Sequence, residues 1–369
     1  MKIGKTTLIP QNVAPATAKR IVICDSGENV VGKCGLGHLA MPTNIGEKIL
    51  SVGLISDSHV YDTDEGETSY KPNYDTNAPQ DLERAIKFFR DKKVTFVCVC
   101  GDLTSYGTTA SLEKYKEIVD ANRGDMPVYS IAGNHEYWGE PWGGGKPYPN
   151  IPTEIKTYTG LDLFDVVEHG GDVFIFAGAT AIEDEFTTIT VKIGNETKSL
   201  NKYDWLVEQF NKYSGKRIFL FVHCFLKGDG VAKNEPSIYC GDSTGIINTV
   251  DMIKTSTSKF IDLLKANPNV IYFHGHSHTM LEMQDYTQKL NPPRPANYDF
   301  ECGVHSIHIP STTMPRDISS GAREEEGAKS EGYIMDVYEN HIVLRGIDFE
   351  SGRDIPIATY CLDTTLQTV

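Results

Sequence analysis

The stretch ILSVGLISDSHV, residues 49–60, predicts a buried strand whose tip carries two polar side chains. The run from 49 to 55 is mostly apolar and does not alternate, which is typical of a strand covered on both faces within a parallel sheet. Asp57 and His59 come directly after it, so a carboxylate and an imidazole lie close together at the strand end. Whether the two form half of a metal site depends on which side chains stand at the ends of the other strands.

Four further apolar stretches of strand length also end in side chains that can bind metals. In chain order they are 94–100 followed by Asp102, 127–132 followed by Asn134, His135 and Glu136, 217–222 followed by His223, and 270–274 followed by His276 and His278. Ligands of open α/β sheets bind at the carboxyl ends of the strands. A single such motif is weak, because a lone strand histidine is more often a core residue, but their conjunction predicts one shared site.

Helical patterns alternate with these strands along most of the chain. Four helices are predicted, over 79–93, 110–122, 202–213 and 256–266. The first is opened by Pro79 and presents Leu82, Ile86 and Phe89 as one apolar stripe. This alternation predicts an α/β fold with a mainly parallel sheet.

Both ends of the chain depart from this alternation. The tail GYIMDVYENHIVLRGIDF, residues 332–349, predicts a hairpin that turns at Glu339 and Asn340, so part of the sheet system should be mixed. Near the start, RIVICDSGENVVGKCGL, residues 20–36, predicts strand, turn and strand. We therefore expect residues 1–48 to form a small β appendage suited to assembly or homo-oligomer formation, and residues 49–369 to form the main domain.

The composition of the chain limits the kinds of partner and the location that we expect. The formal net charge of −15 argues against nucleic acid, since non-specific binding to its backbone depends on Lys and Arg. Neither a membrane span of about 18 apolar residues nor the apolar region of a signal peptide is visible, so we expect a cytoplasmic protein without membrane contact. The eight cysteines have no framework spacing, which predicts free thiols.

The ligand types indicate which metals would suit the site. Asp, Asn and His offer oxygen and imidazole nitrogen, which suit Mn, Fe, Zn or Ni, and no cysteine joins the set. Two divalent ions about 3.5–4 Å apart need a bridging carboxylate. Asp102 is the expected bridge, because its strand lies between the other two ligand-bearing strands of that part of the chain.

The order D-x-H, G-D, G-N-H-E, H and G-H-x-H over roughly residues 50–280 resembles the calcineurin-like metallophosphoesterase family, and most closely its bacterial members similar to cyclic-nucleotide phosphodiesterases. The resemblance implies a four-layer α/β/β/α sandwich with two mixed sheets, residues 49–369 being the catalytic domain. It also implies two ions that share Asp102. One would be held by Asp57, His59, Asp102 and His278, and the other by Asp102, Asn134, His223 and His276.

The resemblance also implies a reaction. Hydroxide formed from a water between the two metals would attack a phosphoester, and His135 would protonate the leaving oxygen or stabilise charge in the transition state. Glu136 would either orient an imidazole or be a surface acid. Purple acid phosphatases carry a metal-binding tyrosine after Gly-Asp; Tyr106 comes one position too late, and His59 stands where that group lacks histidine, which disfavours this subclass.

The substrate is less well defined by the sequence. We expect phosphodiesters or nucleotides, with a nuclease on the same core, or a phosphoesterase or scaffold tethered to an assembly, as alternatives. In the loop 136–150, Tyr137, Trp138 and Trp142 would either stack on the substrate or pack locally. His274 is expected behind the ligands or in the core, and the loop 309–317 after His308 is expected to border the pocket.

Overall fold

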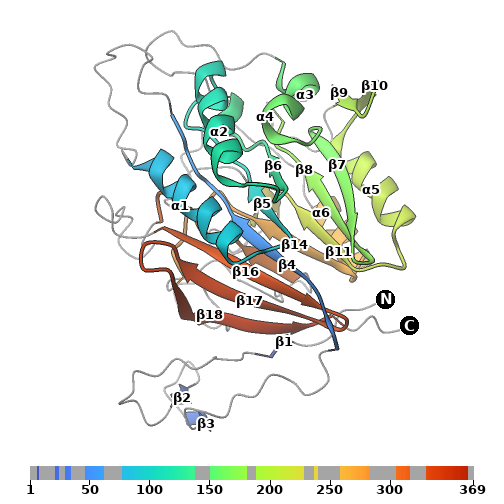
Figure 1. Cartoon of the computed structure of the whole chain (residues 1–369). Coiled ribbons are helices and arrows are strands. Elements are labelled where there is room, and N and C mark those ends of the chain that lie inside the picture. The colour runs from blue at the N-terminus through green and yellow to red at the C-terminus, as the bar shows by residue number, and fades with distance from the viewer. Residues whose placement is uncertain are drawn as a thin grey trace.

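The structure is a computed structural model of the 369-residue chain. It describes residues 6–7, 21–24, 30–34, 46–61, 77–137, 150–180, 188–227, 237–239, 258–281, 305–315 and 330–364. The fold follows the predicted alternation of strands and helices, and two sheets carry most of the described chain (Figure 1).

The larger sheet has seven strands in the order β1-β18-β17-β16-β4-β5-β6. The neighbours β4, β5 and β6 run parallel, whereas β16 pairs antiparallel with β4 and continues into the tail hairpin. That hairpin turns at Glu339 and Asn340, as predicted. The strands are β1 (Thr6–Thr7), β4 (Lys48–Ile55), β5 (Phe96–Cys100), β6 (Val128–Ile131), β16 (Glu331–Tyr338), β17 (His341–Asp348) and β18 (Arg353–Asp363).

The second sheet has five strands in the order β15-β14-β11-β8-β7. Four of them are parallel, and β7 pairs antiparallel with β8 at the edge. The prediction of two mixed sheets is therefore confirmed. The strands are β7 (Phe164–His169), β8 (Asp172–Ala177), β11 (Ile218–Phe221), β14 (Val270–His274) and β15 (His305–His308).

A core of apolar side chains from both sheets joins them face to face. Val52, Phe96 and Ile131 of the larger sheet share one buried cluster with Phe174 and Phe219 of the second. The rings of Phe96 and Phe174 meet edge to face at 5.0 Å, and those of Phe174 and Phe219 stack at 4.8 Å. Burying large aromatic side chains stabilises this contact strongly, so the two sets of strand ends are held at a fixed separation.

Helices cover the outer face of each sheet. The first two pack on the larger sheet in one cluster with Ile86, Phe89 and Tyr115, and the later ones pack on the second sheet with Trp205, Leu206 and other residues. All four predicted helices are present, with ends close to the predicted ones. The helices are α1 (Ala78–Asp91), α2 (Thr109–Asn122), α3 (Ile151–Glu154), α4 (Lys156–Thr159), α5 (Lys202–Lys212) and α6 (Ser258–Ala266).

Three small antiparallel hairpins and the 3-10 helix η1 (His135–Tyr137) complete the described elements. The hairpins are β2 (Ile21–Cys24) with β3 (Val30–Cys34), β9 (Ile189–Ile193) with β10 (Glu196–Leu200), and β12 (Phe225–Lys227) with β13 (Ser237–Tyr239). The first confirms the predicted strand pair near the start of the chain. Since β1 pairs with β18, residues 6–7 extend the larger sheet, while the division of the chain at residue 48 stays a prediction.

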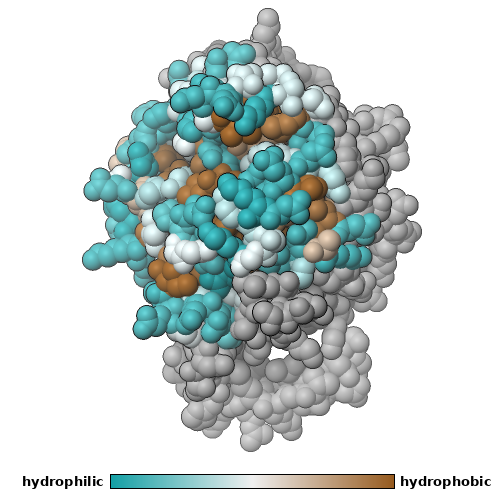
Figure 2. All heavy atoms as spheres, turned by 90° about the vertical axis from the view of Figure 1, so that its right-hand side faces the viewer, coloured by the Kyte–Doolittle hydropathy of each residue, from teal (hydrophilic) through white to brown (hydrophobic). Residues whose placement is uncertain are grey.

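The face that carries α5 and the β9–β10 hairpin is mostly hydrophilic, with hydrophobic residues in separate areas of its described part (Figure 2). Among large hydrophobic residues of the described chain, Ile49 stands out as exposed, at 40%. Within the same residues, none of the helices combines the length and apolar character needed to cross a bilayer.

The prediction that all cysteines are free thiols is wrong. Cys98, Cys100 and Cys361 are buried free thiols, as expected, but Cys224 is disulfide-bonded. Spacing along the sequence does not reveal which cysteines a fold brings together, so scattered cysteines held no sign of this bond.

Candidate metal centre

Strained backbone is concentrated at the predicted ligands. Only one other described non-glycine residue, Lys93, shares their left-handed conformation. The ligands concerned, with their φ angles, are Asp57 (53°), His59 (43°), Asp102 (48°), His276 (68°) and His278 (56°). Each such residue costs on the order of 1–3 kcal/mol and persists only where its surroundings enforce it. This edge of the sheets is therefore built for the placement of side chains rather than for stability.

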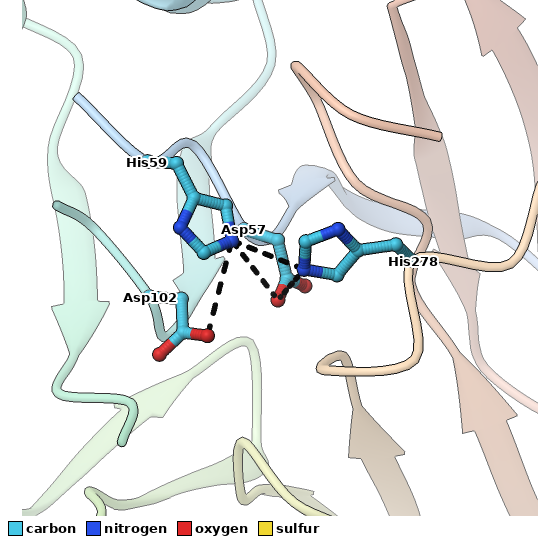
Figure 3. Close-up of side chains that lie close together, drawn as sticks. All are labelled: Asp57, His59, Asp102 and His278. Carbon is cyan, nitrogen blue, oxygen red and sulfur yellow. Dashed lines mark hydrogen bonds and ion pairs between the residues drawn. The ribbon is translucent and has the colours of Figure 1, made fainter. Parts of the chain in front are cut away.

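Four of the predicted ligands converge in what we call the Asp57 group: Asp57, His59, Asp102 and His278. Their side chains point toward one another, Asp57 and His59 from the loop after β4 and the other two from the loops after β5 and β14 (Figure 3). The Nε2 atom of His278 lies 3.0 Å from His59 Nε2 and 3.1 Å from Asp57 Oδ1. His59 Nε2 is also 3.9 Å from Asp102 Oδ2. All four residues are buried, and one ligand atom of each lies within 4.8 Å of the others, so the group could hold one metal ion.

A second cluster, the His223 group, consists of Asp102, His223 and His276. His223 Nε2 lies 3.1 Å from Asp102 Oδ2 and 3.2 Å from His276 Nδ1. These ligand atoms also lie within 4.8 Å of one another, and all three residues are buried. Asp102 belongs to both groups, so the structure brings two candidate metal positions together around one carboxylate.

A buried acceptor without a hydrogen-bond donor indicates whether these residues are suited to bind cations. Asn134 Oδ1 is buried and makes no hydrogen bond within the described structure. A buried acceptor without a donor costs about 1–3 kcal/mol, which a bound cation would relieve. The donor set of carboxylate, amide oxygen and imidazole therefore fits two divalent cations.

Backbone carbonyls orient three of the imidazoles. Nδ1 of His223 lies 2.7 Å from the Cys100 carbonyl oxygen, and Nδ1 of His278 lies 3.2 Å from that of Met314. Nδ1 of His135 lies 2.8 Å from the Ser105 carbonyl. Because a carbonyl only accepts, Nδ1 donates in each case and Nε2 is the nitrogen directed into the site.

The protonation states suit metal binding. Burial alone would raise the pKa of Asp57, but His278 and His223 more than offset it and hold this pKa well below its usual value. The pKa of Asp102 is also held low against the effect of burial, chiefly by His223 and His135. Burial, reinforced by His135 and His278, lowers the pKa of His59. The site thus favours ionised carboxylates and a neutral His59. At His223, Asp102 and Asp57 more than offset the effect of burial and raise the pKa to about 10, so a metal ion that binds this imidazole would displace a proton.

Two glycines of the motifs are required because other side chains approach their Cα atoms closely. At Gly101, which has φ +88°, a Cβ would lie 2.4 Å from His223 Nδ1. At Gly275 a Cβ would lie 2.5 Å from Asp57 Oδ2 and 2.0 Å from Ser56 Oγ. The glycines of the G-D and G-H-x-H motifs therefore make room for ligands supplied by other strands.

Glu136 has a different role from both predicted ones. It is buried, so the surface-acid alternative is wrong. Its carboxylate accepts hydrogen bonds from Gly133 N at 2.6 Å and from Thr104 N and Oγ1, both at 2.9 Å, rather than orienting an imidazole. Burial, with a further contribution from the charge of Asp102, raises the pKa of Glu136 to about 8. The residue ties the loop after β5 to the loop after β6.

The structure describes only part of the predicted substrate loop, residues 136–150. The Tyr137 hydroxyl donates to the Ala179 carbonyl at 2.9 Å, and its ring packs against the core under the second sheet, which favours local packing over stacking on a substrate. Trp138 and Trp142 lie outside the described residues. His274 is buried, and its ring lies 5.6 Å from that of Tyr272 and 5.2 Å from that of His308, as expected for a residue behind the ligands.

The loop 309–317 contacts the ligands, in line with the expectation that it borders the pocket, but the contacts of individual supporting residues were not predicted. Ser105 Oγ donates to the His59 carbonyl at 2.8 Å, and Ser311 Oγ donates to the Asp57 carbonyl at 2.9 Å. A hydrogen bond between a hydroxyl and a carbonyl that are far apart in the sequence leaves no recognisable motif. The nearest available signal is that Ser311 falls in a hydroxyl-rich run directly after a short strand.

The fold and these two ligand groups define a metal-binding α/β protein with its site at the strand ends. Residues 50–280 match the family model of calcineurin-like phosphoesterases, which is more than half of the chain. The chain therefore belongs to the calcineurin-like phosphoesterase family and is a metal-dependent phosphoester hydrolase. None of the curated proteins matches it in sequence.

Two solved structures show the same fold at low sequence identity. A dimetal phosphatase from Danio rerio is 14% identical with a TM-score of 0.51, and the match covers 86% of this chain and 100% of that one. A purple acid phosphatase from yellow lupin (Lupinus luteus) seeds is 12% identical with a TM-score of 0.53, covering 89% of this chain and 58% of that one. At such identities the likeness supports the fold, and the prediction against the purple subclass stays a prediction.

Proposed function

We propose that the chain hydrolyses phosphodiesters or nucleotides with two divalent metal ions. The observation that carries this proposal is the sharing of Asp102 between two buried ligand groups. One ion would be held by the Asp57 group. The other would be held by the His223 group together with Asn134, whose buried Oδ1 makes no hydrogen bond within the described structure.

The ions would supply positive charge for the phosphoryl oxygens and lower the pKa of a water molecule that serves as the nucleophile. Local positive charge of this kind is needed, because the chain as a whole carries a net charge of −15. The carboxylates of Asp57 and Asp102 balance part of it, and both are held ionised by the neighbouring imidazoles.

His135 is the proposed proton donor. Its Nδ1 is bound to the Ser105 carbonyl, so Nε2 is the atom directed into the site, 3.8 Å from Asp102 Oδ2. Its ring also meets that of His59 edge to face at 4.6 Å. A protonated Nε2 there can transfer its proton to the departing oxygen, or donate a hydrogen bond to a phosphoryl oxygen as negative charge develops.

The charge of the chain supports diesters over monoesters, because a net charge of −15 leaves the two ions as the main source of positive charge for the substrate. A phosphomonoester carries a charge of about −1.5 to −2 at pH 7, whereas a diester carries a single charge. A diester therefore needs less positive charge from the protein in addition to the two ions.

Hydrolysis of bis-p-nitrophenyl phosphate and of p-nitrophenyl phosphate, each with Mn²⁺, tests the proposal. The diester should be cleaved with the higher kcat/KM, and metal analysis should find two ions per chain. Faster cleavage of the monoester would contradict the substrate class, while the finding of fewer than two ions would contradict the dinuclear site. Cleavage of plasmid DNA would favour the nuclease alternative.

A further inference from the structure

The loop after β15 supports the Asp57 group although it lies beyond residue 280, where the match to the family model ends. Ser311, Thr312, Thr313 and Met314 are all buried. Ser311 forms an isolated parallel bridge with Ser56, at the end of β4, more than 250 residues earlier in the chain. We call residues 311–314 the STTM segment.

The STTM segment holds the backbone of Asp57. The hydroxyls of Ser311 and Thr313 both donate to the Asp57 carbonyl, at 2.9 and 3.2 Å. Beside them, Thr312 donates to the Ser56 carbonyl through its amide at 2.9 Å and its hydroxyl at 3.1 Å. Asp57 has φ +53°, a conformation that surrounding contacts must enforce. Two hydroxyl donors on its own carbonyl are such contacts.

The same segment orients His278. The Met314 carbonyl accepts from His278 Nδ1 at 3.2 Å, which directs Nε2 toward Asp57. Met314 is fixed in turn by its amide, which donates to Ser311 Oγ at 2.8 Å. Ser311 thus connects the anchors of both ligands. On the same side, His308 Nε2 lies 2.7 Å from Ser277 Oγ, within the G-H-S-H loop.

The contacts of the His223 group are of a different kind. His223 is oriented by the Cys100 carbonyl, and the His276 amide donates to the Asp57 carboxylate at 3.0 Å. The described hydrogen bonds of the STTM hydroxyls reach the backbone around Asp57 and the segment itself, and its contact with a ligand side chain is the one to His278.

We propose that the STTM segment positions Asp57 and His278 for one of the two ions, with Ser311 as the principal positioning residue. This inference rests on the proposed two-metal function. Its consequence is selective: loss of the Ser311 or Thr313 hydroxyl weakens the ion at the Asp57 group and leaves the ion at the His223 group in place. Contacts that orient metal ligands typically contribute about 10-fold to 100-fold in metal affinity.

Calorimetric titration of the metal-free full-length chain with Mn²⁺ tests this without reference to activity. Ser311→Ala and Thr313→Val should each weaken one of two binding events by about tenfold or more, with the other unchanged. Thr313→Ser keeps the hydroxyl and should bind as wild type does. Ser51→Ala removes a hydroxyl from β4, the strand that leads to Asp57, at a position where it donates to Asp336, and should leave both binding events unchanged.

The outcomes separate the two proposals. If the wild-type chain binds fewer than two ions, the proposed function fails. If it binds two, and the variants bind both with wild-type affinity or lose affinity for both equally, the positioning role is overturned. Thr313→Val is nearly isosteric with the native residue, so it decides the question even if Ser311→Ala does not fold.

Discussion

The Asp57 group and the His223 group share a carboxylate but are built in different ways. All four members of the Asp57 group have left-handed backbone, whereas in the His223 group Asp102 and His276 have it and His223 does not. Hydroxyl side chains anchor the first group, through Ser311 and Thr313 on Asp57 and Ser105 on His59. The second relies on the backbone, since the carbonyl of Cys100 orients His223.

This difference shows two ways to place a ligand at a strand end. A side chain that leaves an extended strand, such as His223 after β11, needs only one carbonyl and a glycine opposite it. A ligand in a tight left-handed turn can reach farther into the site, but its strain must be offset by added hydrogen bonds. The Asp57 group should therefore respond to hydroxyl removal and the His223 group to crowding of the backbone.

Asp102→Ala should have the largest effect, because it removes the residue that both groups share. Each ion contributes several kcal/mol to transition-state stabilisation, so activity toward bis-p-nitrophenyl phosphate should fall by roughly ten-thousandfold or more. Metal analysis should find fewer than two ions per chain. Asp120→Ala, at an exposed position of α2, is the matched control and should retain both ions and activity. Two retained ions in Asp102→Ala would rule out the bridging assignment.

His135→Ala should come next and should distinguish ligands from the proton donor. His135 belongs to neither group, so both ions should stay bound while kcat falls by about a hundredfold to a thousandfold. His169→Ala, which removes a partly buried histidine at the end of β7, should change stability without this loss. Loss of an ion in His135→Ala would place the residue among the ligands.

The sequence predicted most of what places the ligands and little of what holds them. Asp57, Asp102 and His223 each come after an apolar run that can only be a buried strand, and parallel strands bring such ends to one edge. This logic needs only local patterns, and it predicts one shared site in a partly mixed sheet system. The two mixed sheets and the division of the ligands into two groups were implied by the resemblance to the calcineurin-like family.

Supporting contacts depend on partners far apart in the chain. The sequence around Ser311 and Met314 does not indicate that Ser311 donates to the Asp57 carbonyl or that the Met314 carbonyl accepts from His278. The β9–β10 hairpin was missed for another reason. Its alternating Ile189, Val191 and Ile193 and the turn at Gly194 are a hairpin signal, but short exposed strands are easily overlooked beside long buried ones.

Gly101→Ala should damage the His223 group more than the Asp57 group, although Gly101 also precedes the shared Asp102. A Cβ there has a left-handed backbone cost of about 1–2 kcal/mol and also collides with His223, which adds about 1–3 kcal/mol. Gly171→Ala is a close control, since Gly171 has φ +91° and nothing within 4 Å of an added Cβ. Chemical denaturation of the metal-free proteins should show a larger loss of stability for Gly101→Ala, and calorimetry should show one ion weakened more than the other. Equal losses for the two variants would mean that the imidazole yields easily.

Glu136→Gln should have the smallest effect, on the link between the loops that carry Asp102 and Asn134. One carboxylate oxygen accepts from both the amide and the hydroxyl of Thr104, and the other accepts from Gly133 N. A glutamine must turn its NH₂ toward one of these donors, which leaves a buried amide unpaired at a cost of about 1–3 kcal/mol.

The loss in Glu136→Gln should be seen in the free energy of unfolding, with Glu113→Gln, exposed on α2, as the control. Because the loop after β5 bears the shared Asp102, the affinities for the two ions should fall together rather than one at a time. A selective loss of one ion would show instead that Glu136 serves a single group, and the loops after β5 and β6 would then act independently.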